Sequence, residues 1–166
     1  MIIVEQRLSD AFDQLPTIDG FKPVYDWGNK FQLLALLKSY ENDKKSPYPL
    51  VYQLSNDSTQ EPNKNTAETR LRLILATRNL QTELLNRNRW AMSYRNVLFP
   101  LVTNIEKVIL RAGIFNSLPV YRLYTHPNYG NQENENFTAD IWDALEMEFT
   151  EPLIINNSCI NTQIKF

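Results

Sequence analysis

The chain has little of what common metal, redox and nucleotide sites require. Its 166 residues include one cysteine, Cys159, one histidine, His126, and four glycines that stand far apart. A single cysteine forms no internal disulfide, and one cysteine with one histidine does not complete a conventional zinc site. The isolated glycines exclude a glycine-rich phosphate loop and a Gly-x-Ser-x-Gly turn. We therefore expect no cofactor, no metal and a protein that is assembled in a reducing compartment.

Long apolar runs and a strong charge excess are also missing. No run is long enough to cross a bilayer, and charged residues follow the N-terminal Met1-Ile2-Ile3-Val4 at once, so neither a transmembrane helix nor a signal peptide is expected. A formal net charge of -2 suits neither a non-specific DNA-coating protein nor an acidic disordered tail. The 43% of hydrophobic residues is enough for a buried core. We expect a single domain over residues 1–166, with polar, asparagine-rich loop insertions near 55–65 and 125–140.

The first forty residues predict one helix and leave two segments open. Apolar residues recur at helical spacing from Val4 to Leu15, and Pro16 ends that element. Residues 21–28 are rich in aromatic side chains but contain a proline, which cannot donate to a central ladder, so they form an edge strand or an ordered loop. Residues 31–40 fit neither the helical nor the strand period. Helix and strand remain alternatives there.

Two later segments predict neighbouring strands. Residues Leu50–Leu54 are short, β-prone and followed by turn-forming side chains. Residues 68–77 alternate, with leucine at every second position on one face and mainly arginine on the other. We expect a half-buried strand there, paired with the preceding one.

Trp90 to Gly113 is the strongest single element. Its apolar residues repeat at spacings of three and four, and Gly113 is a suitable C-terminal stop. Pro100 either lies in the first turn of a helix that begins near Leu98 or kinks a longer helix that begins near Arg89. Both alternatives place one long amphipathic helix on the sheet.

The remaining segments predict mostly strands. Residues 120–124 alternate, 141–145 suit one helical turn, 146–149 and 153–155 suggest a terminal hairpin, and 160–166 alternate again. The order of these elements predicts an α+β fold, in which a small, mainly antiparallel sheet is packed by an N-terminal helix and one long amphipathic helix.

Neither the histidine nor the cysteine suggests catalysis. His126 precedes proline in a polar segment with no nearby nucleophile, and Cys159 is typical of a small buried apolar residue. Seven carboxylates between Arg122 and Lys165 lack the spacing of a calcium-binding loop and indicate a solvated acidic surface. We expect no enzymatic activity.

Charge placement is more informative than any catalytic motif. Six arginines lie between Arg70 and Arg95 against Glu83 alone, whereas no lysine or arginine occurs between Arg122 and Lys165. The arginine-rich part is a solvated surface, a nucleic-acid patch in which aromatic rings stack on bases, or one side of a head-to-tail oligomer whose other side is the acidic part. The candidate interface residues are Arg70, Arg72, Arg87, Arg89, Trp90, Tyr94, Arg95, Glu133, Glu135, Asp140 and Asp143.

The order of elements resembles tail-terminator and tail-completion proteins of tailed bacteriophages. The stretch Arg89-Trp90-Ala91-Met92-Ser93-Tyr94-Arg95-Asn96-Val97-Leu98-Phe99-Pro100-Leu101 is similar to sequences in neck-ring proteins of crAss-like phages. The loops at residues 55–65 and after His126 have no fixed counterpart in that family. The resemblance implies no active site, and it implies a small subunit that stacks in a ring between portal and tail.

The first hypothesis is therefore a structural subunit of the head-to-tail connector of a phage virion, either the neck or the tail-terminator ring. Its implied partners are further copies of itself and other neck, portal or tail proteins, with DNA passing through the lumen without specific binding and no membrane contact. Reversing the charge of Arg87 and Arg89 is expected to block assembly. The alternative is a nucleic-acid-binding module that uses residues 70–95, with an affinity that falls steeply with salt.

Overall fold

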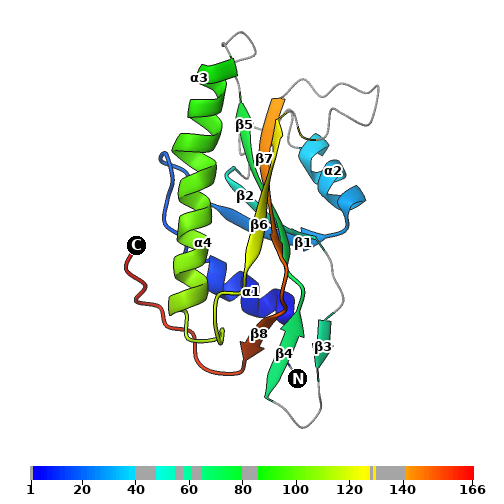
Figure 1. Ribbon diagram of the computed structural model, residues 1–166, viewed down its shortest axis with the longest axis vertical. Coiled ribbons are helices and arrows are strands. Elements are labelled where there is room, and N and C mark those ends of the chain that lie inside the picture. The colour runs from blue at the N-terminus through cyan, green and yellow to red at the C-terminus, as the bar shows by residue number, and fades with distance from the viewer. Residues whose placement is uncertain are drawn as a thin grey trace.

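The computed structural model describes residues 2–39, 48–54, 58–60, 65–79, 86–127, 129 and 141–166. Figure 1 shows a long helix lying across a twisted sheet. In chain order the elements are α1 (Val4–Phe12), β1 (Val24–Gly28), α2 (Lys30–Ser39), β2 (Leu50–Leu54), β3 (Ser58–Gln60), β4 (Thr66–Thr69), β5 (Arg72–Asn79), α3 (Asn86–Trp90), the π-helical η1 (Ala91–Leu98), α4 (Phe99–Arg111), β6 (Tyr121–Pro127), β7 (Ile141–Phe149) and β8 (Leu153–Asn156).

The main sheet has five strands in the order β1-β2-β5-β7-β6. Only the β1–β2 pair is parallel, and the other three pairs are antiparallel. The predicted α+β class with a mainly antiparallel sheet is therefore confirmed. The segment at residues 21–28 contributes an edge strand, β1, which begins directly after Pro23.

The two faces of this sheet carry separate cores. Side chains along β5 and β7 alternate between them, as successive side chains of a strand must. The core beneath α1 and the long helix receives Leu73, Leu75, Leu145 and Met147. The core beneath α2 receives Ile74, Ala76, Trp142 and Ala144. Because the middle of β5 is buried on both faces, the expectation of a half-buried strand at residues 68–77 is wrong.

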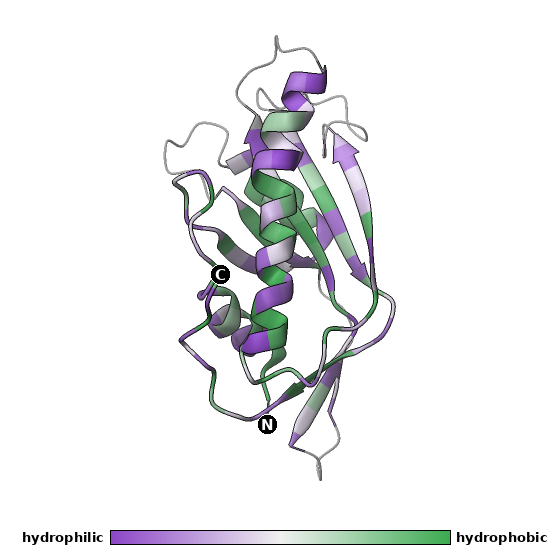
Figure 2. Ribbon diagram, turned by 60° about the vertical axis from the view of Figure 1, so that its left-hand side comes forward, coloured by the Kyte–Doolittle hydropathy of each residue, from purple (hydrophilic) through white to green (hydrophobic). Residues whose placement is uncertain are grey.

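The long helix runs continuously from α3 through η1 to α4, so Pro100 lies inside a longer helix. The amide of Phe99 bonds the carbonyl of Tyr94, five residues back, as in a π-helix. Proline has no N–H and its ring crowds the preceding turn, and the wider π-helical turns before it relieve that crowding. Gly113, with φ +77°, follows the last turn, as the sequence predicted. Figure 2 shows polar upper turns and a more apolar middle where this helix crosses the sheet.

A second, three-stranded sheet, β3-β4-β8, continues from the β5–β7 pair. Leu71 lies opposite Phe149, and Thr69 lies opposite Leu153. Arg70 alone therefore faces the three residues 150–152, and this extra length bends the ribbon. The bend splits the strand expected at residues 68–77 into β4 and β5.

Three sequence expectations for the second half are wrong. Residues 141–145 belong to β7, whose pairing with strands on both sides overrides their weak helical pattern. Strands β7 and β8 lie in different sheets and form no hairpin, because β8 pairs with β4. Residues 160–166 form no strand; Ile160 and Ile164 pack on the core instead.

The two predicted loop insertions are described only in part. Strand β3 lies within residues 55–65, and residues 125–127 belong to β6. The rest of the second insertion, apart from Tyr129, lies outside the described residues.

Candidate functional site

The sequence-predicted interface residues fall on three elements. Arg70 and Arg72 lie at the bend before and at the start of β5, Asp143 lies on β7, and Arg87, Arg89, Trp90, Tyr94 and Arg95 lie on α3 and η1. Glu133, Glu135 and Asp140 lie outside the described residues. The structure brings Arg89 into direct contact with Asp143. It pairs Arg72 with Glu146, which was not among the candidates.

Arg89 and Asp143 form an ion pair between the helix and the sheet. Arg89 Nη2 lies 2.6 Å from Asp143 Oδ1, and its Nε lies 3.2 Å from Oδ2, so the guanidinium grips the carboxylate with two bonds. The Asp143 side chain is 1% exposed and that of Arg89 is 14% exposed. This pair holds the start of the long helix on the sheet and is buried inside the chain. Neither side chain is presented to a partner.

Three aromatic side chains that follow Arg89 along the long helix pack against one another. Trp90 stacks on Tyr94 with ring centres 5.8 Å apart, and both rings contact Phe99. The Tyr94 hydroxyl donates to the carbonyl of Ala144, 3.4 Å away, and burial raises the pKa of Tyr94 above its ordinary value. Trp90 keeps about half of its surface exposed. Tyr94 is thus a core residue, and Trp90 is only partly available for stacking on a base.

Three polar side chains meet on the face of the sheet that carries α2. Arg72 Nε donates to Glu146 Oε1, and His126 Nε2 lies 3.1 Å from Glu146 Oε2. The bond to Glu146 raises the pKa of Arg72 above its ordinary value. Glu146 is 7% exposed, so these two contacts compensate a buried carboxylate. Among the described residues no group of three metal-ligating side chains occurs.

A hollow of about 480 Å³ opens at the bend between the two sheets. Its walls come from the starts of β5 and β6, the end of β7 and the residues next to them: Arg70, Leu71, Arg72, Arg122, Glu148, Phe149 and Thr150. The hollow lies there because residues 150–152 bulge away from Arg70 and interrupt the ladder. Bulges often redirect side chains beside functional sites.

Strand β6 is an open edge of the main sheet. The amide of Thr150 bonds the carbonyl of Val120, and alternation along the strand then turns the backbone groups of Tyr121, Leu123 and Thr125 away from β7. In the described part of the chain, no strand pairs with this outer side. Such an edge is ready to accept a strand from another molecule.

Large apolar side chains are exposed around both edge strands. Val120, Leu123 and Tyr124 lie on or beside β6, and Phe21, Val24, Trp27 and Phe31 lie on or beside β1. Phe31 is 80% exposed and Val120 is 65% exposed. Exposed apolar groups that gather in one region mark an interaction surface, whereas scattered ones carry no such meaning. The sheet therefore has two unlike apolar edges on opposite sides.

The structure corrects the interpretation of one residue, Cys159, and adds several residues that the sequence analysis did not single out. Cys159 is exposed, because residues 157–166 run over the surface without a strand partner, and is not the buried apolar residue that was expected. Arg122, Glu146 and Glu148 were not predicted as a group. The spacing of two residues between Glu146 and Glu148 was the available signal, since it places their side chains on one face of a strand.

Comparison with known proteins gives no assignment. No protein-family model matches the chain, and no curated protein matches it. Among the described residues, no helix is long and apolar enough to cross a membrane.

Proposed function

We propose that the chain is a structural subunit that assembles head-to-tail into a ring and serves in the head-to-tail connector of a phage virion. The two unlike apolar edges of the sheet carry this proposal. A surface that pairs with a different surface of the next copy generates a ring or a filament, whereas a two-fold dimer uses the same surface twice. The layout of elements, similar to tail-terminator and tail-completion proteins, supports the connector role.

The proposal joins the β6 edge of one copy to the β1 edge of the next. Burying a side chain such as Phe31 or Val120 contributes about 1.5–3 kcal/mol, which is roughly a factor of ten or more in an association constant. The charges of Arg72 and Arg89 play no part in this contact, because both are paired inside the chain. Reversal of Arg89, proposed from the sequence, would place a carboxylate beside buried Asp143 and disturb the fold.

The test uses two variants damaged at opposite edges. Phe31→Ser weakens the β1 side and Val120→Ser weakens the β6 side, and Leu110→Ser on α4, where the wild-type side chain is 61% exposed, is the matched control. Light scattering measures the mass of each variant over a concentration series. We expect the wild type and the control to form the larger assembly and each edge variant to be mainly monomeric.

Mixing the two edge variants distinguishes the symmetry. An equimolar mixture retains one intact β6 edge and one intact β1 edge, so it is expected to form a heterodimer and nothing larger. A variant that dimerises alone would show a two-fold contact and contradict the head-to-tail arrangement. A wild-type chain that stays monomeric at high concentration would require another virion protein for assembly or refute the ring.

Nucleic-acid binding is the second candidate function. Its support is that Arg87 and Arg95 are exposed on the same helix as the half-exposed Trp90. It predicts that DNA binding weakens steeply between 50 and 200 mM salt, roughly tenfold or more for several phosphate contacts. If an Arg87→Glu variant binds DNA as tightly as the wild type, nucleic-acid binding through this helix is excluded.

A further inference from the structure

The two edge strands of the main sheet run in opposite directions. β1 is parallel to β2, and each of the three following pairs is antiparallel, so β6 runs against β1. In a head-to-tail ring the same rotation relates every copy to the next, so neighbouring copies keep nearly the same orientation when their strands run along the ring axis. The β6 edge of one copy then meets the β1 edge of the next as an antiparallel pair.

Both edges have backbone groups that point away from the sheet. Those of β6 are described above. On β1 the amide of Val24 bonds the carbonyl of Pro49 in the direction of β2, so alternation turns the backbone groups of Tyr25 and Trp27 outward. In both strands these outward residues have their side chains on the face with the core beneath the long helix. Directly opposite residues of an antiparallel pair share a face, so pairing keeps that core on one side of the extended sheet.

Each edge also carries one charged side chain without an ion-pair partner among the described residues. On β1, Asp26 Oδ1 accepts a hydrogen bond from the amide of Trp27, 2.8 Å away. On β6, Arg122 is exposed and forms no hydrogen bond or ion pair within the described part of the chain. Asp26 lies opposite Tyr52 and Arg122 lies opposite Glu148, both on the face that carries α2. The two charges therefore share a face where β6 joins β1.

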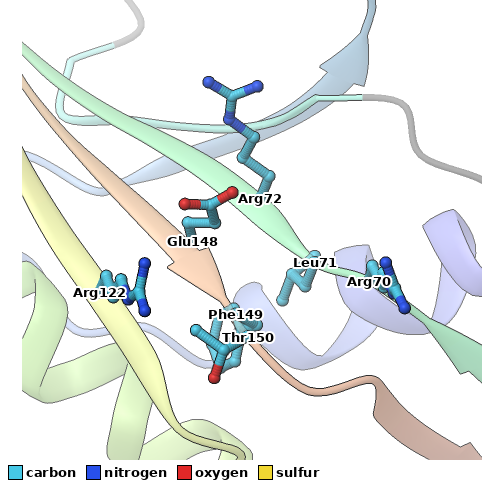
Figure 3. Close-up of a pocket in the computed structure, with 7 residues that line it drawn as sticks. All are labelled: Arg70, Leu71, Arg72, Arg122, Glu148, Phe149 and Thr150. Atoms are coloured by element: carbon cyan, nitrogen blue, oxygen red, sulfur yellow. The ribbon is translucent and has the colours of Figure 1, made fainter.

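Figure 3 shows that Arg122 ends a row of charges of alternating sign. Arg72, Glu148 and Arg122 lie opposite one another across β5, β7 and β6. Arg72 is bonded to Glu146, and Glu148 balances Arg122, so the row has no excess positive charge with which to hold a free anion. A carboxylate on a neighbouring strand instead continues the alternation. Opposite charges directly across a strand pair stabilise it, and like charges destabilise it.

We propose that β6 of one copy pairs antiparallel with β1 of the next, in the register that places Asp26 of the second copy opposite Arg122 of the first. This inference rests on the proposed head-to-tail assembly and gives that contact its register. A shift by two residues would place Asp26 opposite Tyr124 or Val120 and leave Arg122 without a carboxylate from the neighbour. The other opposed side chains are aromatic or apolar: Trp27 with Tyr121, Tyr25 with Leu123, and Val24 with Tyr124.

The same register gives a role to the bond between Asp26 and the amide of Trp27. In the isolated chain this bond covers an outward amide and protects the edge from pairing at random. When Arg122 of the neighbouring copy binds the carboxylate, the amide of Trp27 is released and donates to the carbonyl of Tyr121. Asp26 thus exchanges a contact within its own chain for one between copies.

The register also brings together the two exposed apolar side chains that the assembly test replaces. Val120 directly precedes β6 and lies opposite Gly28, the last residue of β1. Phe31 follows Gly28 by three residues, at the start of α2. Val120 of one copy and Phe31 of the next therefore lie at the same end of the contact.

Disulfide cross-linking tests the register in the full chain. Exposed Cys159 is first replaced in a Cys159→Ser background. Val24→Cys and Tyr124→Cys are placed in separate chains, which are mixed and oxidised with glutathione disulfide. In the proposed register these residues form a non-hydrogen-bonded pair with Cα atoms about 4.5 Å apart, which suits a disulfide. We expect this pair to link at least about tenfold faster than Val24→Cys with His126→Cys or with Val120→Cys, whose partners lie out of register.

A charge swap tests the pair between Asp26 and Arg122. Arg122→Asp alone and Asp26→Arg alone each place like charges at the contact, and each is expected to weaken association roughly tenfold, measured by light scattering. A chain with both substitutions restores an opposite pair and is expected to associate within about threefold of the wild type. Arg95→Asp, at an exposed position of the long helix, is the control. Combined with Asp26→Arg it restores the net charge but not the pair, so association should stay weak.

Other outcomes overturn the inference, and they separate it from the proposed function. Equal linking of all three cysteine pairs, or a charge swap that does not restore association, refutes the register. If Phe31→Ser and Val120→Ser still abolish assembly in that case, the ring stands. A Val24→Cys or Tyr124→Cys chain that links fastest to itself shows a two-fold contact and refutes both. Selective linking of Val24→Cys with Tyr124→Cys in a protein that never grows beyond dimers supports the register and refutes the ring.

Discussion

The ion pair between Arg89 and Asp143 makes the sharpest prediction about stability. Two bonds, of 2.6 and 3.2 Å, join a guanidinium that is 14% exposed to a carboxylate that is 1% exposed. Arg89→Met keeps the aliphatic stem but removes the charge that compensates Asp143 inside the sheet. Breaking a buried pair from one side costs about 3–5 kcal/mol. That is a large part of the roughly 5–15 kcal/mol by which a domain is stable.

A double-mutant cycle separates the pair from its surroundings. Asp143→Leu leaves the arginine without its carboxylate, and we expect it to cost about 3 kcal/mol as well. The double variant leaves no uncompensated charge, so it should cost less than the sum of the two single variants by about 2–3 kcal/mol. Urea denaturation at neutral pH measures each free energy of unfolding. Arg87→Met, on the same helix but exposed, is the control and should stay within about 0.5 kcal/mol of the wild type. The reasoning is refuted if the stability losses of the two single variants simply add in the double variant, or if Arg89→Met lowers the free energy of unfolding by less than about 1 kcal/mol.

The remaining predictions concern a glycine and a tyrosine. Gly28→Ala should lower the free energy of unfolding by about 1–3 kcal/mol in urea denaturation, because a Cβ there collides with the side chains that face it. Gly20→Ala is the control: its Cβ meets no atom within 4 Å, so it should cost only the backbone strain of a non-glycine residue at positive φ. Burial and a hydrogen bond to Glu106 raise the pKa of Tyr121 to about 12 from 10.0, so its contribution to stability is complete below pH 10 and is lost as the pH rises from 10 to 12. Tyr121→Phe should therefore lose less stability between pH 9 and 12 than the wild type, and an equal loss in both would contradict this assignment.

The helices were predictable where the sequence shows a clear period. The spacing of Leu8, Phe12 and their neighbours predicted α1, and the repeat through Leu101 and Ile105 predicted the long helix. Helix α2 lacks such a period, although a local signal was present. The amide of Asn29 bonds the Gln32 side chain and the amide of Gln32 bonds the Asn29 side chain, both at 2.9 Å, as in a capping box. That reciprocal pair marks the start of the helix.

The central strand β7 was the main error, and its cause is electrostatic. Asp143, Glu146 and Glu148 interrupt the apolar residues of this strand, and residues 141–145 were predicted to form one helical turn. In the fold the carboxylates of Asp143 and Glu146 are buried, and each is compensated by an arginine far away in the sequence. A strand buried on both faces normally reads as a continuous apolar run. Two buried carboxylates, each paired with an arginine, conceal that pattern, and no local propensity reveals them.

Charges are unevenly distributed along the sequence, and the order of strands in the sheet decides which of them pair inside the chain. Because β7 lies between β5 and β6, the acidic strand is placed against arginines from both sides. Arg72 of β5 is thereby paired with Glu146, and Arg89 of the long helix is paired with Asp143 from above the sheet, so a contact between copies has to use the remaining charges. Arg122 is left because its neighbour Glu148 lies across the register without bonding it. Subtracting the internal pairs from the charge pattern therefore removes Arg72 and Arg89 from the candidate contacts, and it leaves Arg87 and Arg95 on the long helix and Arg122 at the open edge of the sheet.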